Sequence, residues 1–336
     1  MNATVLVVGG AGYIGSHMVQ ALVRAGHAVT VLDNLSTGHA DAVKGAQLVR
    51  GDLRIRKDIE PVLRQAKFDA VMHFAACCYV GESMQEPHKY YENNVVGSLN
   101  LLDAMRVAGV RRLVFSSSCT TYGNPQRLPM DETHAQNPVN PYGMTKFAAE
   151  RAMADYGRAY GLRTIALRYF NAAGCDPDGE LGERHDPEPH LIPLVLREAL
   201  RIRAGGAPEA TGLVVHGEDF DTPDGTCIRD YVHVSDLCDA HLLAMQLPLR
   251  DEAKAFDAFN LGNGQGFSVL DVIKTCRSVT GLDIRYAVGA RRPGDPPALV
   301  ADSGRARAEL GWAPRFANLQ DIVRTAWNWF SARERA

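Results

Sequence analysis

The sequence predicts an α/β protein built on a doubly wound parallel sheet, followed by a smaller mixed α/β domain. Through the first half of the 336 residues, short apolar β-branched runs alternate with helical stretches, which is the pattern of βαβ units. One of these runs leads directly into a glycine-rich turn. After Asn171 the composition changes to a stretch rich in Pro, Gly and acidic residues, which indicates that a second unit begins there.

The first half contains six candidate strands. They are residues 4–8, 28–32, 47–49, 70–74, 113–116 and 164–168. Each is a short apolar run, as strands buried on both faces of a parallel sheet usually are. Helices are predicted near residues 14–25, 94–108 and 142–160. This order of elements is typical of a Rossmann-like doubly wound sheet, which we expect over residues 1–174.

The second unit, residues 175–336, is expected to be the smaller, substrate-binding domain. Residues 175–193 are rich in Pro, Gly, Asp and Glu, so we expect a lid or inter-domain loop there. Beyond this loop the sequence predicts one strand at 213–216 and helices at 194–203, 236–246, 268–280 and 319–330. We expect the chain to cross back between the two units.

Composition excludes several classes of partner. Lys and Arg total 36 against 39 Asp and Glu, a net charge of -3. The chain therefore lacks the excess of basic residues that nucleic-acid binding usually requires. Residues 4–23 carry no charged side chain, but four glycines and several polar residues dilute the run and no basic segment precedes it. We therefore expect neither a membrane anchor nor a signal peptide.

The cysteines indicate a reducing compartment. There are seven, an odd number, and none forms a C-x-x-C pair. They are expected to be reduced thiols in a cytoplasmic protein, and their spacing gives no zinc pattern, so no metal is expected.

The first strand runs into a glycine-rich turn that precedes a helix, with the sequence Gly9-Gly10-Ala11-Gly12-Tyr13-Ile14-Gly15. Glycine lets the backbone turn tightly and approach a pyrophosphate, and the free N–H groups at the helix start favour its negative charge. Two registers fit, Gly10-x-Gly12-x-x-Gly15 and Gly9-x-x-Gly12-x-x-Gly15, and both place the phosphates at the same helix start. The candidate cofactor-binding residues of this turn are Gly9, Gly12, Tyr13, Ile14 and Gly15.

The acidic residues that follow the next strands favour NAD over NADP. Asp33 ends the second strand, 18 residues after Gly15, near the spacing at which an acid grips the adenosine ribose hydroxyls and repels a ribose phosphate. No Arg or Lys lies between Asn34 and Ala42 to neutralise such a phosphate. Asp52 follows the third strand and is a candidate acceptor for the adenine amino group, although a solvated loop aspartate fits its position equally well.

A tyrosine and a lysine mark the start of the helix at residues 142–160. Tyr142 and Lys146 are four residues apart, which places them on one helix face, and Asn140 and Pro141 suit the cap and the first turn. A phenol with a pKa of about 10 is a poor base at neutral pH, but an adjacent ammonium and a cationic nicotinamide favour its phenolate. Tyr142 could then accept a hydroxyl proton.

Three serines strengthen this interpretation. Ser116, Ser117 and Ser118 lie at the carboxyl end of the fifth strand, 24 residues before Tyr142, where open α/β sheets bind their ligands. Ser118 could donate a hydrogen bond to the reacting oxygen.

With these residues the chain resembles the extended short-chain dehydrogenase/reductases, and within them the UDP-glucose 4-epimerases. The resemblance is nearly full length. It extends to Leu32-Asp33-Asn34-Leu35, His73-Phe74-Ala75-Ala76, Val80-Gly81-Glu82-Ser83, Asn93-Asn94-Val95, Ser116 to Gly123, Asn140-Pro141-Tyr142-Gly143, Arg168-Tyr169-Phe170-Asn171, Cys227-Ile228-Arg229-Asp230-Tyr231 and Arg291-Arg292-Pro293-Gly294-Asp295.

The resemblance implies roles for particular residues. The catalytic residues are Ser118, Tyr142 and Lys146. The cofactor-binding residues, besides the glycine turn, are Asp33, Asn34, Asp52, Leu53, Phe74, Asn93, Lys146 and Tyr169. The substrate-binding residues are Ser118, Tyr142, Asn171, Leu191, His216, Arg229, Arg292, Asp295 and Leu299. Independently, a diphosphate needs guanidinium partners, which Arg229 and Arg292 could supply.

The activity implied is NAD-dependent 4-epimerisation of a UDP-hexose, the UDP-glucose/UDP-galactose pair, through a 4-keto intermediate, in a homodimer. Close alternatives are 4-epimerases of UDP-xylose/UDP-arabinose or of UDP-N-acetylglucosamine, and a net NAD-linked nucleotide-sugar dehydrogenase. Dehydration is disfavoured, because Cys119-Thr120 stand where dehydratases carry Asp-Glu. A regulator that senses NAD would not need the three catalytic side chains.

Overall fold

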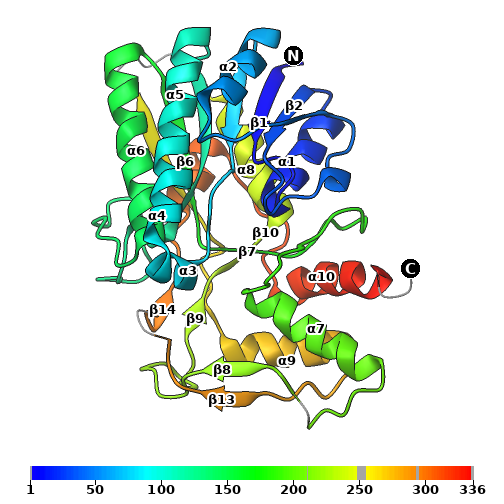
Figure 1. Ribbon diagram of the computed structural model, residues 1–336. Helices are drawn as coiled ribbons and strands as arrows, with labels where there is room; N and C mark the ends of the chain where they lie inside the picture. Colours follow the sequence, from blue (N-terminus) through cyan, green and yellow to red (C-terminus); the bar gives the residue numbers. More distant parts are fainter. Residues whose placement is uncertain (1, 210, 248–254, 293–294, 334–336) are drawn as a thin grey trace.

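A seven-stranded parallel sheet forms the centre of the larger, upper part of the molecule in Figure 1. The computed structural model describes residues 2–209, 211–247, 255–292 and 295–333. The strands are β1 (Thr4–Val8), β2 (Ala28–Asp33), β3 (Gln47–Arg50), β4 (Ala70–His73), β5 (Arg112–Ser118), β6 (Arg163–Tyr169) and β11 (Phe256–Leu261). Their order across the sheet is β11-β6-β5-β4-β1-β2-β3. The direction of winding reverses between β1 and β4, so the predicted Rossmann-like doubly wound sheet is confirmed.

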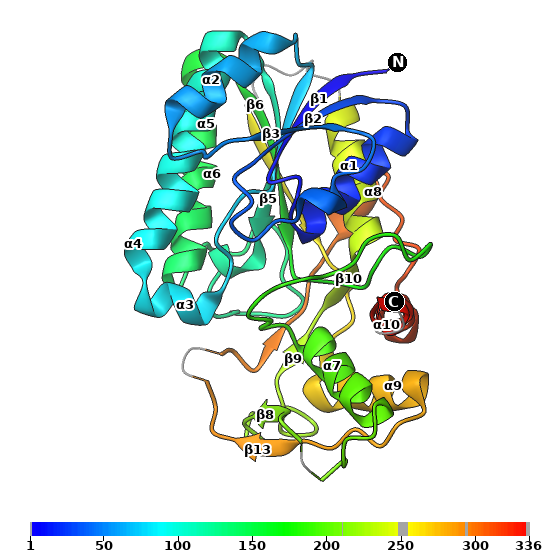
Figure 2. The ribbon, with the colours of Figure 1, turned by 45° about the vertical axis from the view of Figure 1, so that its right-hand side comes forward.

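Helices cover both faces of this sheet (Figure 2). α1 (Tyr13–Arg24) and α8 (Val234–Gln246) contact each other on one face, and α2 (Arg56–Gln65), α5 (Gly97–Ala108) and α6 (Pro141–Tyr160) pack on the other. Apolar runs on the strands are therefore buried on both sides, as parallel sheets require.

The sheet includes one strand that the sequence analysis did not predict. β11 pairs in parallel with β6, with Phe256 opposite Thr164 and Leu261 opposite Tyr169. Its sequence, Phe-Asp-Ala-Phe-Asn-Leu, contains no β-branched residue, so it lacks the signal that identified the other strands. Because α8 and β11 come from beyond residue 174, the chain returns to the sheet after it has entered the smaller part.

The described residues of the smaller part form three helices of more than ten residues and several short strands. The helices α7 (Leu191–Arg203), α9 (Val269–Thr280) and α10 (Leu319–Arg333) pack together around a buried apolar cluster. The strands form three small sheets: β7 (Asn171–Ala173) with β10 (Tyr231–His233), β9 (Ile228–Arg229) with β12 (Phe267–Ser268) and β14 (Ala298–Leu299), and β8 (Val214–His216) with β13 (Ala287–Gly289). The expectation of a mixed α/β part is confirmed.

Two predicted helices were wrong by three residues in where they begin. We expected a loop as far as residue 193 and a helix from 194, but α7 begins at Leu191. Pro193 lies in its first turn, where a missing N–H costs no hydrogen bond. The helix expected from Asn94 begins as α5 at Gly97, because the preceding residues Tyr91–Val96 form a π-helix. The remaining short helical segments are η1 (Ala40–Ala42), α3 (Val80–Gln85), α4 (Pro87–Tyr90), η3 (Cys119–Thr121) and the π-helix η4 (Ala306–Leu310).

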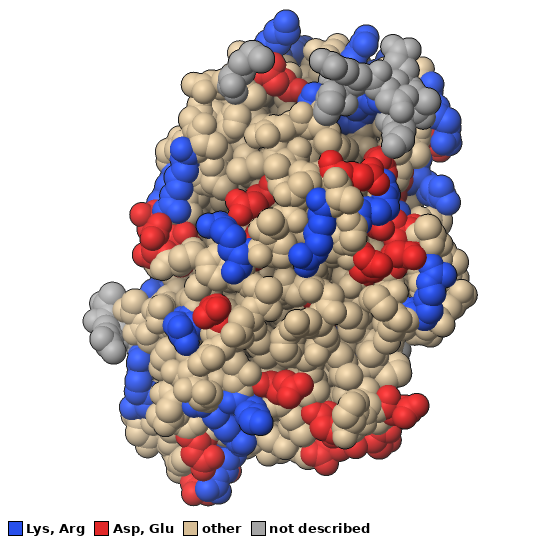
Figure 3. Space-filling model, turned by 180° about the vertical axis from the view of Figure 1, so that it is seen from behind, with Lys and Arg blue, Asp and Glu red and all other residues tan. Residues whose placement is uncertain are grey.

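The surface charge and the helices can be described for part of the molecule. On the face drawn in Figure 3, basic and acidic side chains are interspersed, without a broad basic patch among the residues that the structure describes. No helix in the described part of the chain is long and apolar enough to cross a membrane.

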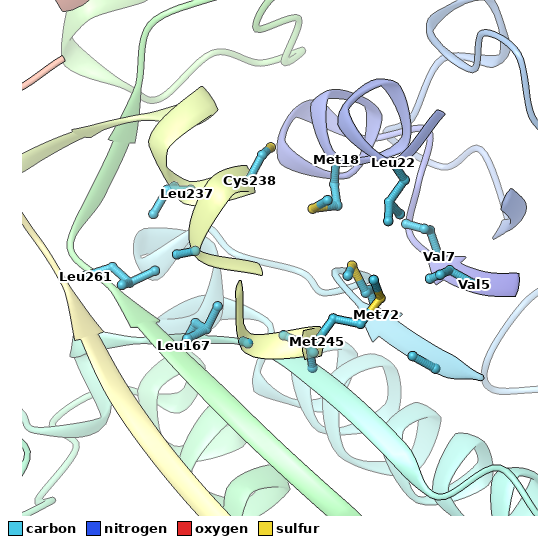
Figure 4. Close-up of a cluster of buried hydrophobic side chains, with 14 of the residues drawn as sticks. Val5, Val7, Met18, Leu22, Met72, Leu167, Leu237, Cys238, Met245 and Leu261 are labelled. Carbon is cyan, nitrogen blue, oxygen red and sulfur yellow. The ribbon is translucent and has the colours of Figure 1, made fainter. Parts of the chain in front are cut away.

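One core cluster holds the start of α1 against the sheet (Figure 4). Met18 and Leu22 of α1 pack with Val5 and Val7 of β1, and α8 contributes further apolar side chains from its buried face. These side chains are buried, and fully burying one aliphatic side chain is worth about 1.5–3 kcal/mol. The turn between β1 and α1 is therefore supported by a rigid base.

Candidate active site

The predicted catalytic residues meet where β5 ends and α6 begins. Ser118 is the last residue of β5, and the side chain of Asn140 caps α6 by accepting a 2.8 Å hydrogen bond from the Gly143 N–H. A Cβ atom at Gly143 would lie 2.4 Å from the carbonyl oxygen of Thr120. Only glycine allows this approach, which brings the start of α6 against the residues that follow Ser118.

The three side chains interact within this junction. The Ser118 hydroxyl accepts hydrogen bonds from the N–H and hydroxyl of Thr120, at 3.2 and 2.9 Å, and it also hydrogen-bonds Tyr142. The Lys146 ammonium is buried and donates a 2.7 Å hydrogen bond to the Ser116 carbonyl. It lies 6.0 Å from the centre of the Tyr142 ring. The structure thus brings together the hydroxyl, phenol and ammonium that the sequence predicts.

Burial controls the protonation of this group. It raises the pKa of the Tyr142 phenol above its ordinary value, while the hydrogen bond to Ser118 acts in the opposite direction. Burial also lowers the pKa of Lys146 to about 8, against the attraction of Cys78 and Glu150. Tyr142 is therefore protonated in the cofactor-free protein. A further positive charge beside the ring would favour its phenolate.

A buried ion pair supports α6 from behind, and sequence reasoning missed it. Glu150, one turn after Lys146, accepts hydrogen bonds of 2.9 and 2.6 Å from the Arg168 guanidinium and one of 2.5 Å from the Ser117 hydroxyl. Burial acts to lower the pKa of Arg168, but the hydrogen bond and charge of Glu150 outweigh it and raise that pKa. Arg168 also donates to Tyr122 at 2.9 Å. The only sequence signal was the four-residue spacing from Lys146.

The glycine turn fits a dinucleotide. A Cβ at Gly9 would lie 2.4 Å from the backbone nitrogen of Ala75, and one at Gly15 would lie 2.0 Å from the Gly9 carbonyl oxygen. At Gly12 the nearest atom is 3.6 Å away, so protein packing does not explain this glycine, whereas a closely approaching ligand does. Among the described residues, no side chain caps α1, and no acid lies in its first turn. Its N–H groups are therefore free to receive phosphate oxygens.

The adenosine-side candidates form a connected set. The buried Asp33 carboxylate accepts hydrogen bonds from Ala11 N–H at 2.9 Å and Leu35 N–H at 2.8 Å, which ties β2 to the glycine turn. Asp52 accepts from Asn34 at 3.0 Å and from Arg54, and the hydrogen bonds of Arg54 lower its pKa. Each carboxylate has further lone pairs for a ligand.

The remaining cofactor candidates lie in different surroundings. Leu53 is buried, and a Cβ at Gly97 of α5 would approach it to 3.0 Å. Asn93 lies in the π-helix, where it donates to Asn94 at 3.0 Å. Asn94, which was not predicted, holds Cys77 through two backbone hydrogen bonds and Thr145 of α6 through a third. The π-helix therefore positions the segment after β4, and such helices are frequent at functional sites.

Two aromatic cofactor candidates face α8. Phe74 lies 4.8 Å from the His241 ring, and the buried Tyr169 hydroxyl is 2.7 Å from His241 Nε2. Tyr13 behaves differently, because its hydroxyl donates a 2.6 Å hydrogen bond to the Gly174 carbonyl. Tyr13 thus connects the glycine turn to the segment that enters the smaller part.

Most substrate candidates converge on β9. The Arg229 guanidinium lies 3.7 Å from the Asp295 carboxylate, which also accepts a 3.0 Å hydrogen bond from Arg292. The Asn171 N–H donates to the Asp230 carbonyl at 2.9 Å, directly after Arg229. Pro293 and Gly294 of the same motif lie outside the described residues. Two guanidinium groups in one cluster suit a diphosphate.

Leu299 connects this cluster to the segment that follows Ser118. It is opposite Arg229 in the β14–β9 pair. Its side chain packs against a buried cluster that includes Cys119, the residue after Ser118. The other two substrate candidates lie further along the smaller part. His216 lies on β8, with its Nδ1 3.3 Å from the Ala290 carbonyl, and Leu191 begins α7.

These features identify the class of protein. The chain belongs to the NAD dependent epimerase/dehydratase family, whose pattern matches residues 5–262. Within the family, several UDP-glucose 4-epimerases are similar to this chain over nearly its full length. The one from Lactobacillus helveticus is 50% identical over 326 residues, which cover 97% of this chain and 96% of that protein. The resemblance stated from the sequence motifs is confirmed.

Solved structures give the same result. A UDP-glucose 4-epimerase from Brucella ovis in complex with NAD is 50% identical, with a TM-score of 0.90 over 98% of both chains. A UDP-glucose 4-epimerase from Stenotrophomonas maltophila with bound NAD and formylated UDP-arabinopyranose is 40% identical, with a TM-score of 0.91 over 99% of both chains.

Proposed function

We propose that this protein is an NAD-dependent isomerase that interconverts UDP-glucose and UDP-galactose by epimerisation at C4. The observation that carries the proposal is the junction of β5 and α6. There Ser118, Tyr142 and Lys146 meet at the carboxyl ends of the strands, at the same edge of the sheet as a glycine turn that fits a dinucleotide. The names of the similar proteins support the same activity.

The residues of the chain have distinct roles in this reaction. The Tyr142 oxygen accepts the proton of the sugar 4-hydroxyl and later returns it, while the Ser118 hydroxyl donates a hydrogen bond to the same sugar oxygen. Lys146 holds its positive charge near the Tyr142 ring and favours the phenolate. Bound NAD would accept the C4 hydride and return it. Arg229 and Arg292 hold the diphosphate while the 4-ketopyranose turns over, so the hydride re-enters on the opposite face.

Incubation with UDP-galactose alone tests the proposal. We expect UDP-glucose to form without added NAD and without a net gain in absorbance at 340 nm, because the reaction consumes no cofactor. A stoichiometric absorbance gain that requires added NAD would instead identify a net nucleotide-sugar dehydrogenase. No conversion of UDP-galactose, UDP-arabinose or UDP-N-acetylgalactosamine, with or without NAD, would refute 4-epimerisation.

NAD is expected to copurify with the protein. Release of NADH during the cycle would leave a reactive ketone, so the cofactor must stay bound, and acid extraction of the purified protein should yield nucleotide. The resemblance to the family implies that Cys78 stands where other members carry Lys, so that a positive charge near the nicotinamide is missing here. Retention is therefore expected to be weaker than in relatives with Lys, and Cys78→Lys should raise the extracted NAD per chain. Equal extraction from both proteins would show that this charge is irrelevant.

Leu299 is expected to limit the sugar substituent at C2. The resemblance to the 4-epimerases implies that a bulky Tyr at this position restricts the pocket to hexoses without an N-acetyl group. Leu is smaller than Tyr and leaves more room at C2. We expect measurable side activity on UDP-N-acetylglucosamine, which Leu299→Tyr should reduce at least tenfold more than activity on UDP-glucose, because an overfilled pocket costs about 1–3 kcal/mol. Leu310→Met, a buried change away from the site, is the control. If Leu299→Tyr lowers the activity on both substrates equally, Leu299 does not limit the substituent at C2.

UDP-xylose and UDP-arabinose remain the second candidate pair. The stretches at residues 76–83 and 226–231 resemble the epimerases that act on these pentoses, and one similar structure holds a UDP-arabinopyranose derivative. Pentoses lack C6 and need no extra room. Relative kcat/KM values on the four substrates decide the preference.

We also propose a homodimer in the cytoplasm. Apolar side chains such as Val96, Leu99 and Val107 of the π-helix and α5, and Met144 of α6, are exposed on the single chain, and a second copy could cover them. All seven cysteines are free thiols, which supports a reducing compartment. Sedimentation equilibrium on the purified protein gives the mass that decides the oligomeric state.

A further inference from the structure

We propose that Glu183, His185, Glu188 and His190 form a structural binding site for a divalent transition-metal ion of the zinc type. Sequence reasoning had placed these residues in a lid or inter-domain loop and expected no metal, because it searched the cysteines. The pattern Glu-x-His-x-x-Glu-x-His was the available signal. The proposal does not depend on the epimerase activity.

The four side chains converge on one point. One ligand atom from each, an imidazole nitrogen or a carboxylate oxygen, lies within 4.8 Å of all the others. The Glu183 carboxylate is 3.0 Å from His185 Nδ1 and 2.7 Å from His190 Nδ1, and Glu188 is 3.7 and 2.9 Å from the same nitrogens. The edges of a tetrahedron around zinc are about 3.4 Å long with bonds of about 2.0–2.2 Å, so small movements would complete the coordination.

Most of these atoms lack a proper hydrogen bond. Glu183 and Glu188 are only 3% and 7% exposed. Among the described residues, Glu183 Oε1, His185 Nδ1 and Glu188 Oε2 are buried atoms without a hydrogen-bond partner of acceptable geometry. Of the four contacts between the imidazoles and the carboxylates, only that of His190 with Glu188, at 2.9 Å, is a hydrogen bond. The contact of His185 with Glu188 is too long at 3.7 Å, and the two contacts with Glu183 are short but lack hydrogen-bond geometry. Lone pairs that converge in this way are better satisfied by a cation between them than by each other.

The surroundings would orient the ligands. The backbone N–H of His190 donates to Glu188 at 3.0 Å, an outer hydrogen bond of the kind that fixes a metal ligand. The rings of Tyr13 and Tyr79 pack edge-to-face against the imidazole of His185, with 6.2 and 5.9 Å between ring centres. Two carboxylates balance a divalent ion, and two imidazoles favour zinc over calcium or magnesium, which prefer oxygen ligands. Four protein ligands leave no open position, so the site is structural.

The rival explanation is a cluster of two carboxylates and two imidazolium groups. Burial acts to lower the pKa of His190, but the hydrogen bonds to Glu183 and Glu188 raise it to about 10. Without a metal, the cluster therefore holds protons at the positions where the ion would bind. Burial of the four side chains is compatible with the protonated cluster and with the metal-bound one. Only metal binding itself separates them.

A bound ion would fix a segment that already contacts the loop after β2. Arg184, between two of the ligands, pairs with Asp41 through hydrogen bonds of 3.0 and 2.8 Å, and its carbonyl contacts His39 at 3.0 Å. A pocket between this segment and the turn is lined by Gly12, Tyr13, Thr37 and His185, among others. All four ligands lie within eight residues, so the ion would hold the segment in one shape over the turn.

The test is the zinc content of the full chain, purified without a polyhistidine tag. We expect about one zinc per chain by elemental analysis in the wild-type protein, and background amounts in His185→Ala and Glu183→Gln. Glu180→Gln in the same segment and His88→Ala at an exposed position are matched controls that should keep the metal. Replacement by Co²⁺ should give the intense visible bands of tetrahedral coordination.

A second measurement serves if a ligand variant does not fold. Wild-type protein stripped with a chelator should take up one equivalent of Zn²⁺ in competition with a chromophoric chelator, and its melting temperature should rise on uptake. Zinc content equal in the wild-type, His185→Ala and Glu183→Gln proteins would overturn the proposal. So would stripped wild-type protein that takes up no Zn²⁺, because the four groups would then be an ion-pair cluster only.

Discussion

Tyr142→Phe is expected to lower epimerase turnover by at least about a hundredfold, the scale of a lost general base. The substitution keeps the ring, which packs edge-on against Tyr90 at 6.4 Å between ring centres, and removes only the oxygen that exchanges the proton. Folding and NAD content should stay unchanged. The measurement is kcat with UDP-galactose at saturating concentration, together with extracted NAD per chain.

The matched control is Tyr156→Phe on the same helix. Tyr156 is half-buried and packs against Tyr160, far along α6 from Ser118. Its loss should change kcat less than twofold, a scale far below that of a lost general base. Turnover of Tyr142→Phe near the wild-type value would contradict the assigned mechanism.

Glu150→Ala is expected to lower the free energy of unfolding by about 3–5 kcal/mol, because it leaves the buried Arg168 charge without its carboxylate. The pair is almost fully shielded, with side chains 5% and 2% exposed, and the same carboxylate also accepts from Ser117 and Gln136. Urea unfolding measures the change, provided that the m-value is unaltered.

A surface pair on α2 provides the comparison. Glu60 and Arg64 form an ion pair of 2.6 Å, but the Arg64 side chain is 65% exposed. Glu60→Ala should therefore change the free energy of unfolding by no more than about 0.5 kcal/mol. Similar decreases in the free energy of unfolding in Glu60→Ala and Glu150→Ala would show that the buried ion pair of Glu150 and Arg168 stabilises the protein no more than a surface pair does.

Local signals in the sequence predicted the parts of the fold that repeat a simple pattern. The strands from β1 to β6 are apolar runs with β-branched residues, and the cap and first turn of α6 are marked by Asn140 and Pro141. The three side chains proposed as catalytic were selected from the sequence because two of them share a helix face and the third ends a strand. Their meeting follows from the topology, since parallel strands end at one edge of the sheet.

Other features depend on contacts between distant residues and were not predicted. β11 has few β-formers and joins the sheet only because β6 offers it an open edge. Glu150 and Arg168 are 18 residues apart in sequence, and their pairing depends on the packing of α6 against β6. Asn94 acts through a π-helix that no local pattern announced. The Glu183 to His190 cluster was not predicted, because the expectation about metals rested on the spacing of the cysteines alone.

The fate of the hydrogen at C4 tests the central claim most directly. UDP-galactose with deuterium at C4 is incubated with the purified protein in ordinary water, and the UDP-glucose formed is analysed by mass spectrometry. If Tyr142 carries only the hydroxyl proton and the cofactor carries the hydride, the deuterium should remain at C4 in essentially every product molecule. Loss of deuterium to the solvent would contradict the account.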